Sequence, residues 1–242
     1  MDMRGALDFT GKRVLVTGGS DGIGYGVACA FRDSGAETIT TGTRAQDAYP
    51  RDFSGMTFKQ LDVGEPASVE ALAADVGELD ALVNCVGTVL YSSKEFEREG
   101  FARVMDINLT GVMHVCQALR DKLAARKGAI VNLDSVVSVR GARNNPAYTA
   151  SKAGLKHLNT VLAVKWGKLG IRVNGIGPGM VPTKLTMNQV REGSEAAFAQ
   201  RVPGGRYGTP EDIAGPVLFL CSPLAAYVTG QSFLVDGGVS LI

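Results

Sequence analysis

A chain of 242 residues in which 45% are hydrophobic and 20% charged can bury a sizeable core, as one large domain or two small ones. Its formal net charge of +1 gives no electrostatic reason to expect binding to nucleic acid or to an anionic membrane. The apolar stretch at 213–221 is far shorter than the ~18 residues that a membrane helix needs, and residues 1–9 lack the apolar run of a signal peptide. We therefore expect a soluble, cytoplasmic protein.

The four cysteines and two histidines are not spaced as a metal site or a disulfide framework requires. No Cys-x-x-Cys pair occurs, and the four cysteines lie far apart in mostly apolar surroundings. This pattern is typical of reduced, largely buried thiols in an intracellular protein. We expect no bound metal and four free thiols, at Cys29, Cys85, Cys116 and Cys221.

The first predicted strand, at residues 12–17, leads directly into a glycine-rich turn and then into a helical pattern. Gly18, Gly22 and Gly24 let the backbone turn tightly and approach a pyrophosphate, which the free N–H groups of a helix N-terminus attract. The spacing is G-x-x-x-G-x-G, and its place between a strand and a helix favours nucleotide binding.

Further along the chain, short apolar runs alternate with helical patterns. We expect strands at residues 12–17, 36–42, 56–61, 79–84, 129–133, 171–176 and 232–236. A long helix is predicted at 95–126, another begins near Pro210, and residues 183–202 are polar and poorly periodic, as in a mobile flap. The alternation predicts a doubly wound parallel sheet, and no repeat, linker or composition break divides the chain. We therefore expect a single domain over residues 1–242.

Three polar residues in the middle of the chain form a candidate catalytic group. Asn145 and Pro146 suit a helix start, so Tyr148 and Lys152 fall four positions apart on one helical face. Ser135 follows the predicted strand at 129–133, and a strand end can meet the first turn of the next helix. A neighbouring ammonium lowers the pKa of a tyrosine from ~10, and such a tyrosine can exchange a proton with an alcohol or carbonyl oxygen. Ser135 would hold that oxygen.

The combination of these motifs resembles the short-chain dehydrogenase/reductase family over nearly the whole chain. The resemblance rests on their joint order and spacing, since each motif by itself is modest. The matching motifs are Thr17-Gly18-x-x-x-Gly22-Ile23-Gly24, Asp62-Val63, Asn84-x-x-Gly87, Asn108, Ser135, Tyr148-x-x-x-Lys152, Pro178-Gly179-x-x-x-Thr183, Arg206-x-Gly208-x-Pro210-Glu211-Asp212-Ile213-Ala214 and Val235-Asp236-Gly237-Gly238.

The resemblance implies a Rossmann fold with seven parallel strands, helices on both faces of the sheet, and NAD(P)-dependent hydride transfer between a secondary alcohol and a ketone. It implies that Tyr148 is the general acid/base, that Lys152 lowers its pKa and holds the nicotinamide ribose, and that Ser135 positions the substrate oxygen. Asn108 would support a water-mediated proton path.

The resemblance also implies the cofactor-binding positions. Asp62 would contact the adenine, and Val181 and Thr183 the nicotinamide end. The full expected set is Gly18, Ser20, Asp21, Gly22, Ile23, Gly24, Thr43, Arg44, Asp62, Val63, Asn84, Gly87, Tyr148, Lys152, Pro178, Gly179, Val181 and Thr183.

The chain departs from the family pattern in three places, one of which is a pair of residues. Cys85-Val86 replaces an Asn-Ala pair, which we expect to be tolerated, and Asp134 stands where a serine is common. Gly42 ends the second predicted strand, where NAD-dependent members commonly carry an acidic residue.

The missing acid at position 42 bears on the choice of cofactor. Thr43 and Arg44 can bind a 2′-phosphate there, whereas Asp21 lies where many NADP-dependent members have a basic residue. The sequence therefore favours NADP(H), with NAD(H) as the alternative.

The rival interpretations are a catalytically silent nucleotide-sensing regulator and a nucleotide-sugar epimerase or dehydratase. A regulator does not need the four catalytic residues together, and an epimerase usually carries an additional substrate domain. The substrate remains open among 3-oxoacyl thioesters, sugars or polyols, and cyclic ketones, since fold analogy cannot choose between them. The expected substrate contacts are Ser135, Val137, Ser138, Arg143, Asn145 and Tyr148.

The C-terminal segment predicts self-association. Chain ends are usually polar and mobile, but this chain finishes on Leu241 and Ile242 with no charged extension. Burying two such side chains against a partner contributes roughly 1.5–3 kcal/mol each. The family resemblance implies two-fold interfaces here and along the long helices, so we expect a homotetramer.

Overall fold

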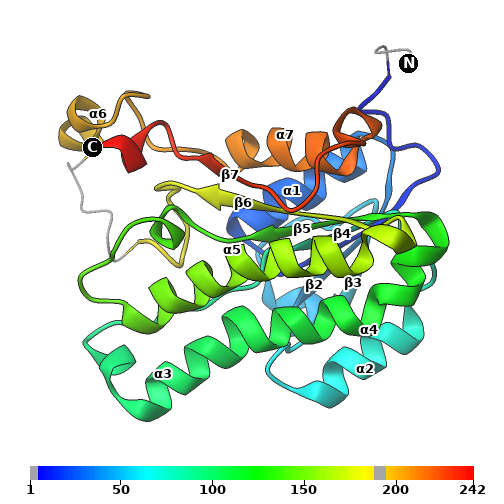
Figure 1. Cartoon of the computed structure of the whole chain (residues 1–242), viewed down its shortest axis with the longest axis horizontal. Helices are drawn as coiled ribbons and strands as arrows, with labels where there is room; N and C mark the ends of the chain where they lie inside the picture. The colour runs from blue at the N-terminus through cyan, green and yellow to red at the C-terminus, as the bar shows by residue number, and fades with distance from the viewer. Residues whose placement is uncertain (1–4, 188–194) are drawn as a thin grey trace.

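The computed structural model describes residues 5–187 and 195–242, and within them seven strands form one parallel sheet between two layers of helices (Figure 1). The strands are β1 (Arg13–Thr17), β2 (Glu37–Gly42), β3 (Met56–Gln60), β4 (Ala81–Asn84), β5 (Ala129–Leu133), β6 (Arg172–Pro178) and β7 (Ser232–Val235). Their order across the sheet is β3-β2-β1-β4-β5-β6-β7, and every neighbouring pair is parallel. The expected doubly wound, seven-stranded sheet is confirmed.

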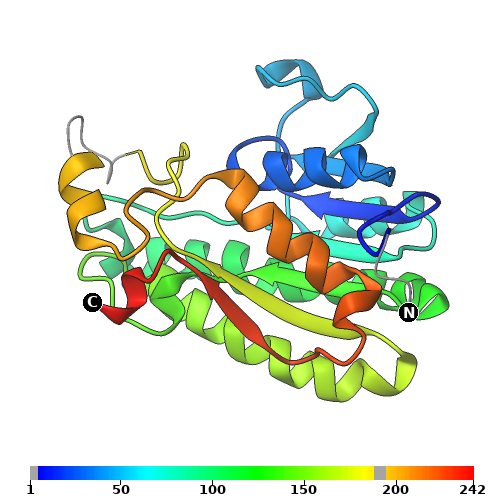
Figure 2. The same ribbon diagram turned by 90° about the horizontal axis from the view of Figure 1, so that it is seen from above.

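Helices cover both faces of this sheet (Figures 1 and 2). One layer holds α2 (Pro66–Asp75), α3 (Arg98–Met105), α4 (Gly111–Arg126) and α5 (Pro146–Trp166). The other holds α1 (Gly22–Asp33) and α7 (Pro210–Cys221), which pack on each other. A short helix, α6 (Glu195–Arg201), lies beside the C-terminus in both views.

The central strands are apolar at nearly every position because both of their faces are covered. In β1, Leu15 points into the core beneath α2, α4 and α5, whereas Val14 and Val16 point into the core beneath α1 and α7. The alternation follows from the two-residue period of a strand, which sends successive side chains to opposite faces.

The long helix predicted at 95–126 is largely confirmed, but it contains a π turn that the sequence did not indicate. The segment consists of a 3-10 turn at Lys94–Phe96, helix α3, a π-helical turn at Asp106–Thr110 and helix α4. A π turn inserts an extra residue into a helix and often marks a functional site. Here it carries Asn108, which is fully buried. The hydrophobic period alone does not reveal such an insertion.

Buried hydrogen bonds join three neighbouring strands to α5 at the carboxyl edge of the sheet. The Thr17 hydroxyl on β1 donates to Asn84 Oδ1 on β4 at 2.9 Å. The Asn84 side-chain amide donates to Asn132 Oδ1 on β5 at 2.8 Å, and the Asn132 amide donates to Asn159 Oδ1 on α5 at 2.7 Å. This amide chain, Thr17–Asn84–Asn132–Asn159, fixes α5 relative to the strand ends.

The strand order reverses between β1 and β4, so the loops after these strands diverge and leave a crevice at the carboxyl edge. The segment predicted as a mobile flap, 183–202, is only partly described, and its residues 183–186 line this edge. Within the segment, 188–194 lie outside the described residues, 183–187 form a turn and 195–201 form α6.

Two other expectations concern membranes and thiols. No helix among the described residues has the length and apolar character needed to cross a bilayer. The four cysteines all lie within the described residues and are free; Cys116 is buried and the other three are half-buried.

Candidate active site

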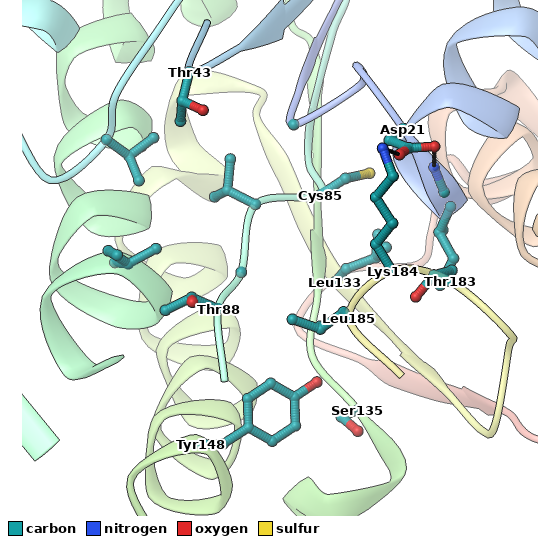
Figure 3. A pocket seen from close by; sticks show the side chains of 18 of the residues that line it. Asp21, Thr43, Cys85, Thr88, Leu133, Ser135, Tyr148, Thr183, Lys184 and Leu185 are labelled. Atoms are coloured by element: carbon teal, nitrogen blue, oxygen red, sulfur yellow. Dashed lines mark hydrogen bonds and ion pairs between the residues drawn. The ribbon is translucent and has the colours of Figure 1, made fainter. Parts of the chain in front are cut away.

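A pocket of about 750 Å³ occupies the crevice at the carboxyl ends of β1, β4, β5 and β6 (Figure 3). Its walls come from the glycine turn after β1, the ends of β2 and β3, the loop after β4, the start of α5 and the segment after β6. Sixteen of the eighteen expected cofactor positions line it. These are Gly18, Ser20, Asp21, Gly22, Ile23, Gly24, Thr43, Asp62, Val63, Gly87, Tyr148, Lys152, Pro178, Gly179, Val181 and Thr183.

The two other expected cofactor positions lie outside the pocket wall. Asn84 is buried behind it as a member of the amide chain. Arg44 is exposed beside the pocket, with its guanidinium 4.5 Å from the centre of the Tyr49 ring.

The glycine turn leaves room for a phosphate at the N-terminus of α1. A Cβ atom on Gly24 would lie 2.2 Å from the carbonyl oxygen of Gly18, so a side chain there would displace the turn. Gly18 has φ +69° and Gly22 φ +55°, a backbone region that glycine adopts without strain. The free N–H groups of the first helical turn face the same end of the pocket, and the cradle therefore fits a dinucleotide pyrophosphate.

Asp21 caps α1 and is neutralised by two cations. Its carboxylate accepts the Gly22 N–H at 2.9 Å and forms ion pairs of 2.6 Å with Arg51 and Lys184. Burial alone would raise its pKa, but the hydrogen bonds from Lys184 and Arg51 lower the pKa to about 2. Figure 3 shows the Lys184 side chain extending to Asp21.

Tyr148 and Ser135 meet in the pocket, as the sequence predicted. Figure 3 shows the phenol ring of Tyr148 and the Ser135 side chain at the same end of the pocket, from the first turn of α5 and from the end of β5. Both side chains line this pocket. A carbonyl oxygen placed between them can contact both groups.

Lys152 lies one helical turn beyond Tyr148 and is only 3% exposed. Its Nζ donates to the carbonyl oxygen of Leu133 at 2.7 Å and lies 5.8 Å from the centre of the Tyr148 ring. Burial lowers the pKa of Lys152 to about 8, although the carboxylate of Asp134 opposes this shift.

That Lys152 lowers the pKa of Tyr148 stays a prediction, because burial dominates the pKa of Tyr148 in this structure. Burial raises the pKa of Tyr148 to about 12, although the hydrogen bond with Ser135 opposes the shift. The physical reason is that both groups are removed from water, which disfavours the phenolate and the ammonium alike.

Asn108 connects the loop after β4 to α5. Its Oδ1 accepts the Thr88 N–H at 2.7 Å, and its Nδ2 donates to the Thr88 carbonyl at 2.9 Å and to Ser151 Oγ at 3.1 Å. Ser151 Oγ in turn donates to the carbonyl oxygen of Tyr148 at 2.8 Å. Asn108 therefore holds both the pocket wall at Thr88 and the backbone of Tyr148.

Asp134 finds its hydrogen-bond partners within the protein. It is 3% exposed, its Oδ1 accepts the Ser135 N–H at 2.7 Å, and its Oδ2 accepts the Ser232 hydroxyl at 2.8 Å. A Cβ atom on Gly177 would lie 2.6 Å from Oδ1, so the neighbouring strand must carry glycine there. Burial raises the pKa of this carboxyl despite the bond from Ser232.

Glu95 is a residue that the sequence did not single out. It is 0% exposed, its Oε2 accepts the Tyr148 N–H at 2.9 Å, and its Oε1 accepts the Leu90 N–H at 2.9 Å. Asn145, which was expected to cap α5, makes no side-chain capping bond and instead donates to the Leu90 carbonyl and to Glu95. Within its polar segment nothing marks Glu95 as different from other acids, so only the fold reveals it.

Only some of the expected substrate contacts line the pocket. Ser135 and Tyr148 line the pocket; Val137 and Ser138 are half-buried beyond it, and Arg143 is exposed. The Ser138 hydroxyl oxygen is buried and has no hydrogen-bond partner among the described residues. Pocket residues that the sequence did not predict include Thr88, Lys184, Leu185 and Thr186. No group of three or more His, Cys, Asp or Glu side chains in the described part of the chain could hold a metal ion.

Comparisons with known proteins match this architecture along almost the whole chain. A family model described as enoyl-(acyl carrier protein) reductase matches residues 18–240. A 3-oxoacyl-[acyl-carrier-protein] reductase of Chlamydia muridarum is 37% identical over 242 residues, which cover 95% of this chain and 97% of the relative. A 2-dehydro-3-deoxy-D-gluconate 5-dehydrogenase of Escherichia coli is 33% identical over 246 residues, which cover 96% and 97%.

A solved structure gives the same match in three dimensions. The gluconate 5-dehydrogenase from Burkholderia cenocepacia, in complex with NADP and tartrate, superposes with a TM-score of 0.87 at 29% identity. The match covers 98% of this chain and 99% of that chain.

The contacts of Glu95 lead to a prediction. Glu95→Gln places an amide N–H against a backbone N–H at Tyr148 or Leu90, so a buried donor loses its acceptor at a cost of about 1–3 kcal/mol. We expect a lower Tm and a lower kcat, measured by calorimetry and by steady-state kinetics. Glu97→Gln is the matched control, because Glu97 is exposed and its side chain makes no capping bond. Equal Tm and kcat in the two variants would contradict this positioning of Tyr148.

Proposed function

The chain belongs to the short-chain dehydrogenase/reductase family and is an NAD(P)-dependent oxidoreductase that interconverts a secondary alcohol and a ketone, and we propose that Tyr148 is its general acid/base. The observation that carries this proposal is the pairing of Tyr148 with Ser135 in the pocket, with Lys152 one helical turn away. A silent regulator would not require this group of side chains.

Tyr148 and Ser135 have different roles in the proposed reaction. When bound in this pocket, a nicotinamide cofactor would supply or accept the hydride. During reduction the Tyr148 hydroxyl gives its proton to the carbonyl oxygen, and during oxidation it takes the proton back. The Ser135 hydroxyl holds the same oxygen and stabilises the charge that develops on it.

Asn108 and Glu95 position the backbone of Tyr148, and Lys152 lies near its ring. Lys152 is held against the Leu133 carbonyl, where its ammonium can bond a cofactor ribose beside Gly87. Asn108 supports the carbonyl of Tyr148 through Ser151, and Glu95 holds its N–H. The phenol thus projects from a helical turn that is fixed at both backbone groups.

NADP(H) is the favoured cofactor. The solved gluconate 5-dehydrogenase that resembles this chain holds NADP. The glycine turn and the α1 N-terminus would bind the pyrophosphate, Asp62 and Val63 the adenine side, and Val181 and Thr183 the nicotinamide side. The objection that Asp21 would repel a 2′-phosphate is weakened, because Arg51 and Lys184 neutralise its charge.

The substrate classes that this proposal favours are 3-oxoacyl thioesters and sugar acids, on which the named relatives act. The pocket end around Thr88, Leu185 and Thr186 offers both polar and apolar contacts. A screen of both classes with NADPH and NADH, followed by reduced-cofactor absorbance, distinguishes them.

The proposal also covers the domain organisation, the cellular location and the oligomeric state. The family match over 18–240 and the single sheet support one domain across residues 1–242. Four free thiols support a cytoplasmic location. Exposed apolar side chains on the C-terminal tail and on α5 support a homotetramer: Leu241 is 83% exposed and Val164 79% exposed.

The role of Tyr148 is tested by Tyr148→Phe, which removes the proton carrier and keeps the ring. We expect kcat to fall by about 10²-fold or more, while cofactor binding measured by fluorescence titration is retained. Near-normal turnover in this variant would remove Tyr148 from the mechanism.

The role of Arg44 is tested by Arg44→Ala. Loss of a charge-assisted hydrogen bond should weaken NADPH binding by about 1–3 kcal/mol and leave NADH binding nearly unchanged. An equal effect on both cofactors, or a wild-type protein that prefers NADH, would show that Arg44 does not recognise the 2′-phosphate.

The oligomeric state is tested by light scattering coupled to size exclusion at micromolar concentration. We expect a mass four times that of the 25.4 kDa chain. A stable monomer would contradict self-association, and a dimer would leave only one of the two surfaces as an interface.

A further inference from the structure

Tyr49 lies on the connection between β2 and β3, directly after a 3-10 turn at Gln46–Ala48. Its ring contacts Phe53 and Phe58, with centroids 6.4 Å and 5.8 Å away. The guanidinium of Arg44 lies 4.5 Å from the centre of the ring. The position of the phenol is therefore fixed by aromatic packing and by a stacked cation.

The Tyr49 hydroxyl occupies the space that a side chain at Gly42 would need. A Cβ atom on Gly42 would lie 2.6 Å from the Tyr49 hydroxyl oxygen and 2.8 Å from Ser20 Cβ. Gly42 and Ser20 both line the cofactor pocket. The phenol thus lies against the pocket wall at the end of β2, although Tyr49 is not itself a lining residue, and it gives a steric reason why no acidic residue stands at position 42.

The hydrogen bonds of this hydroxyl favour a ligand that accepts a proton. Tyr49 Oη accepts the Arg44 N–H at 3.1 Å, which uses part of its acceptor capacity within the protein. Burial alone would raise its pKa, but hydrogen bonds from Thr43, Arg44 and Ser20 lower the pKa to about 8. An acidic phenol is a good donor, and a phosphate dianion is purely an acceptor.

The charges around Tyr49 also suit an anion. Arg44 is stacked on the ring. The acid of the glycine turn, Asp21, is paired with Arg51 and Lys184. The hydroxyls of Ser20 and Thr43 line the pocket between these groups. This edge of the pocket thus presents hydroxyl donors and a cation beside an acid that is already neutralised.

We propose that Tyr49 determines cofactor specificity, because its hydroxyl donates a hydrogen bond to the 2′-phosphate of NADP(H). The inference rests on the proposed cofactor site. Tyr49 would recognise the 2′-phosphate as a hydrogen-bond donor. NAD-dependent members of the family instead carry a carboxylate at the position of Gly42, which accepts a hydrogen bond from the ribose 2′-hydroxyl. A ribose 2′-hydroxyl gains less from this group because it carries no charge.

The test compares two adenine nucleotides that differ only in the 2′-phosphate. Binding of 5′-AMP and of 2′,5′-ADP is measured by isothermal titration for the wild type, for Tyr49→Phe and for Tyr25→Phe. Tyr25→Phe is the matched control, since it removes a phenol of the same aromatic cluster whose hydroxyl bonds the Asp52 carbonyl instead. Thermal denaturation of each variant verifies its folding.

We expect Tyr49→Phe to weaken binding of 2′,5′-ADP by about tenfold or more, the effect of losing one hydrogen bond to a charged group, and to leave 5′-AMP binding within about twofold. Tyr25→Phe should leave both affinities unchanged. Unchanged affinity for 2′,5′-ADP in Tyr49→Phe, or equal losses in the two variants, would overturn the inference and leave the oxidoreductase function standing. Failure of the wild type to bind NADPH would overturn the proposed cofactor and this inference together.

Discussion

The buried amide chain Thr17–Asn84–Asn132–Asn159 is the constraint on which the rest of the site depends. In a low-dielectric interior each of these hydrogen bonds is strong, and a lost partner leaves a costly unsatisfied group. The bonds link β1, β4 and β5 to α5. A slip of one residue in any of these strands would turn the polar side chain to the opposite face of the sheet and break the chain of bonds. The position of α5, and with it that of Tyr148 and Lys152, follows from this network.

The catalytic end of the pocket is built from ionisable groups that are removed from water. Burial lowers the pKa of Lys152 and raises that of Tyr148, because removal from water disfavours the charged form of each group. The two buried carboxylates are stabilised by backbone N–H groups: Asp134 accepts that of Ser135, and Glu95 accepts that of Tyr148. Each acid thus fixes the backbone of a residue that faces the substrate. Such positioning is effective because the acid cannot exchange its partner for water.

At the adenosine end of the pocket, the charge of an acidic side chain is neutralised by two cations, and an aromatic ring is stacked with a third. Asp21 would be an unfavourable neighbour for a phosphate, yet two cations from distant segments pair with it. Gly42 looks like a missing acid in the sequence, but in the structure it is the space that Tyr49 fills. In both cases the role of a residue in cofactor binding is determined by neighbours that lie far away in the chain. We therefore attribute recognition of the cofactor's 2′ position to several residues at this end of the pocket, and not to the end of β2 alone.

The sequence by itself determined the parallel sheet, the glycine turn and the Ser135/Tyr148/Lys152 group, because these depend on local periodicity and on short, ordered motifs. It did not reveal the π turn at Asn108, since an inserted residue leaves the hydrophobic period of the flanking helices intact. It also did not reveal Glu95, whose partners at Leu90 and Tyr148 belong to separate elements. The effect of burial on the pKa of Tyr148 was also hidden, because a sequence shows which charges are near but not how deeply they are buried. The burial of Tyr148 and the long-range contacts of Glu95 arise only when the helices pack on the sheet. The tertiary structure therefore determined these features.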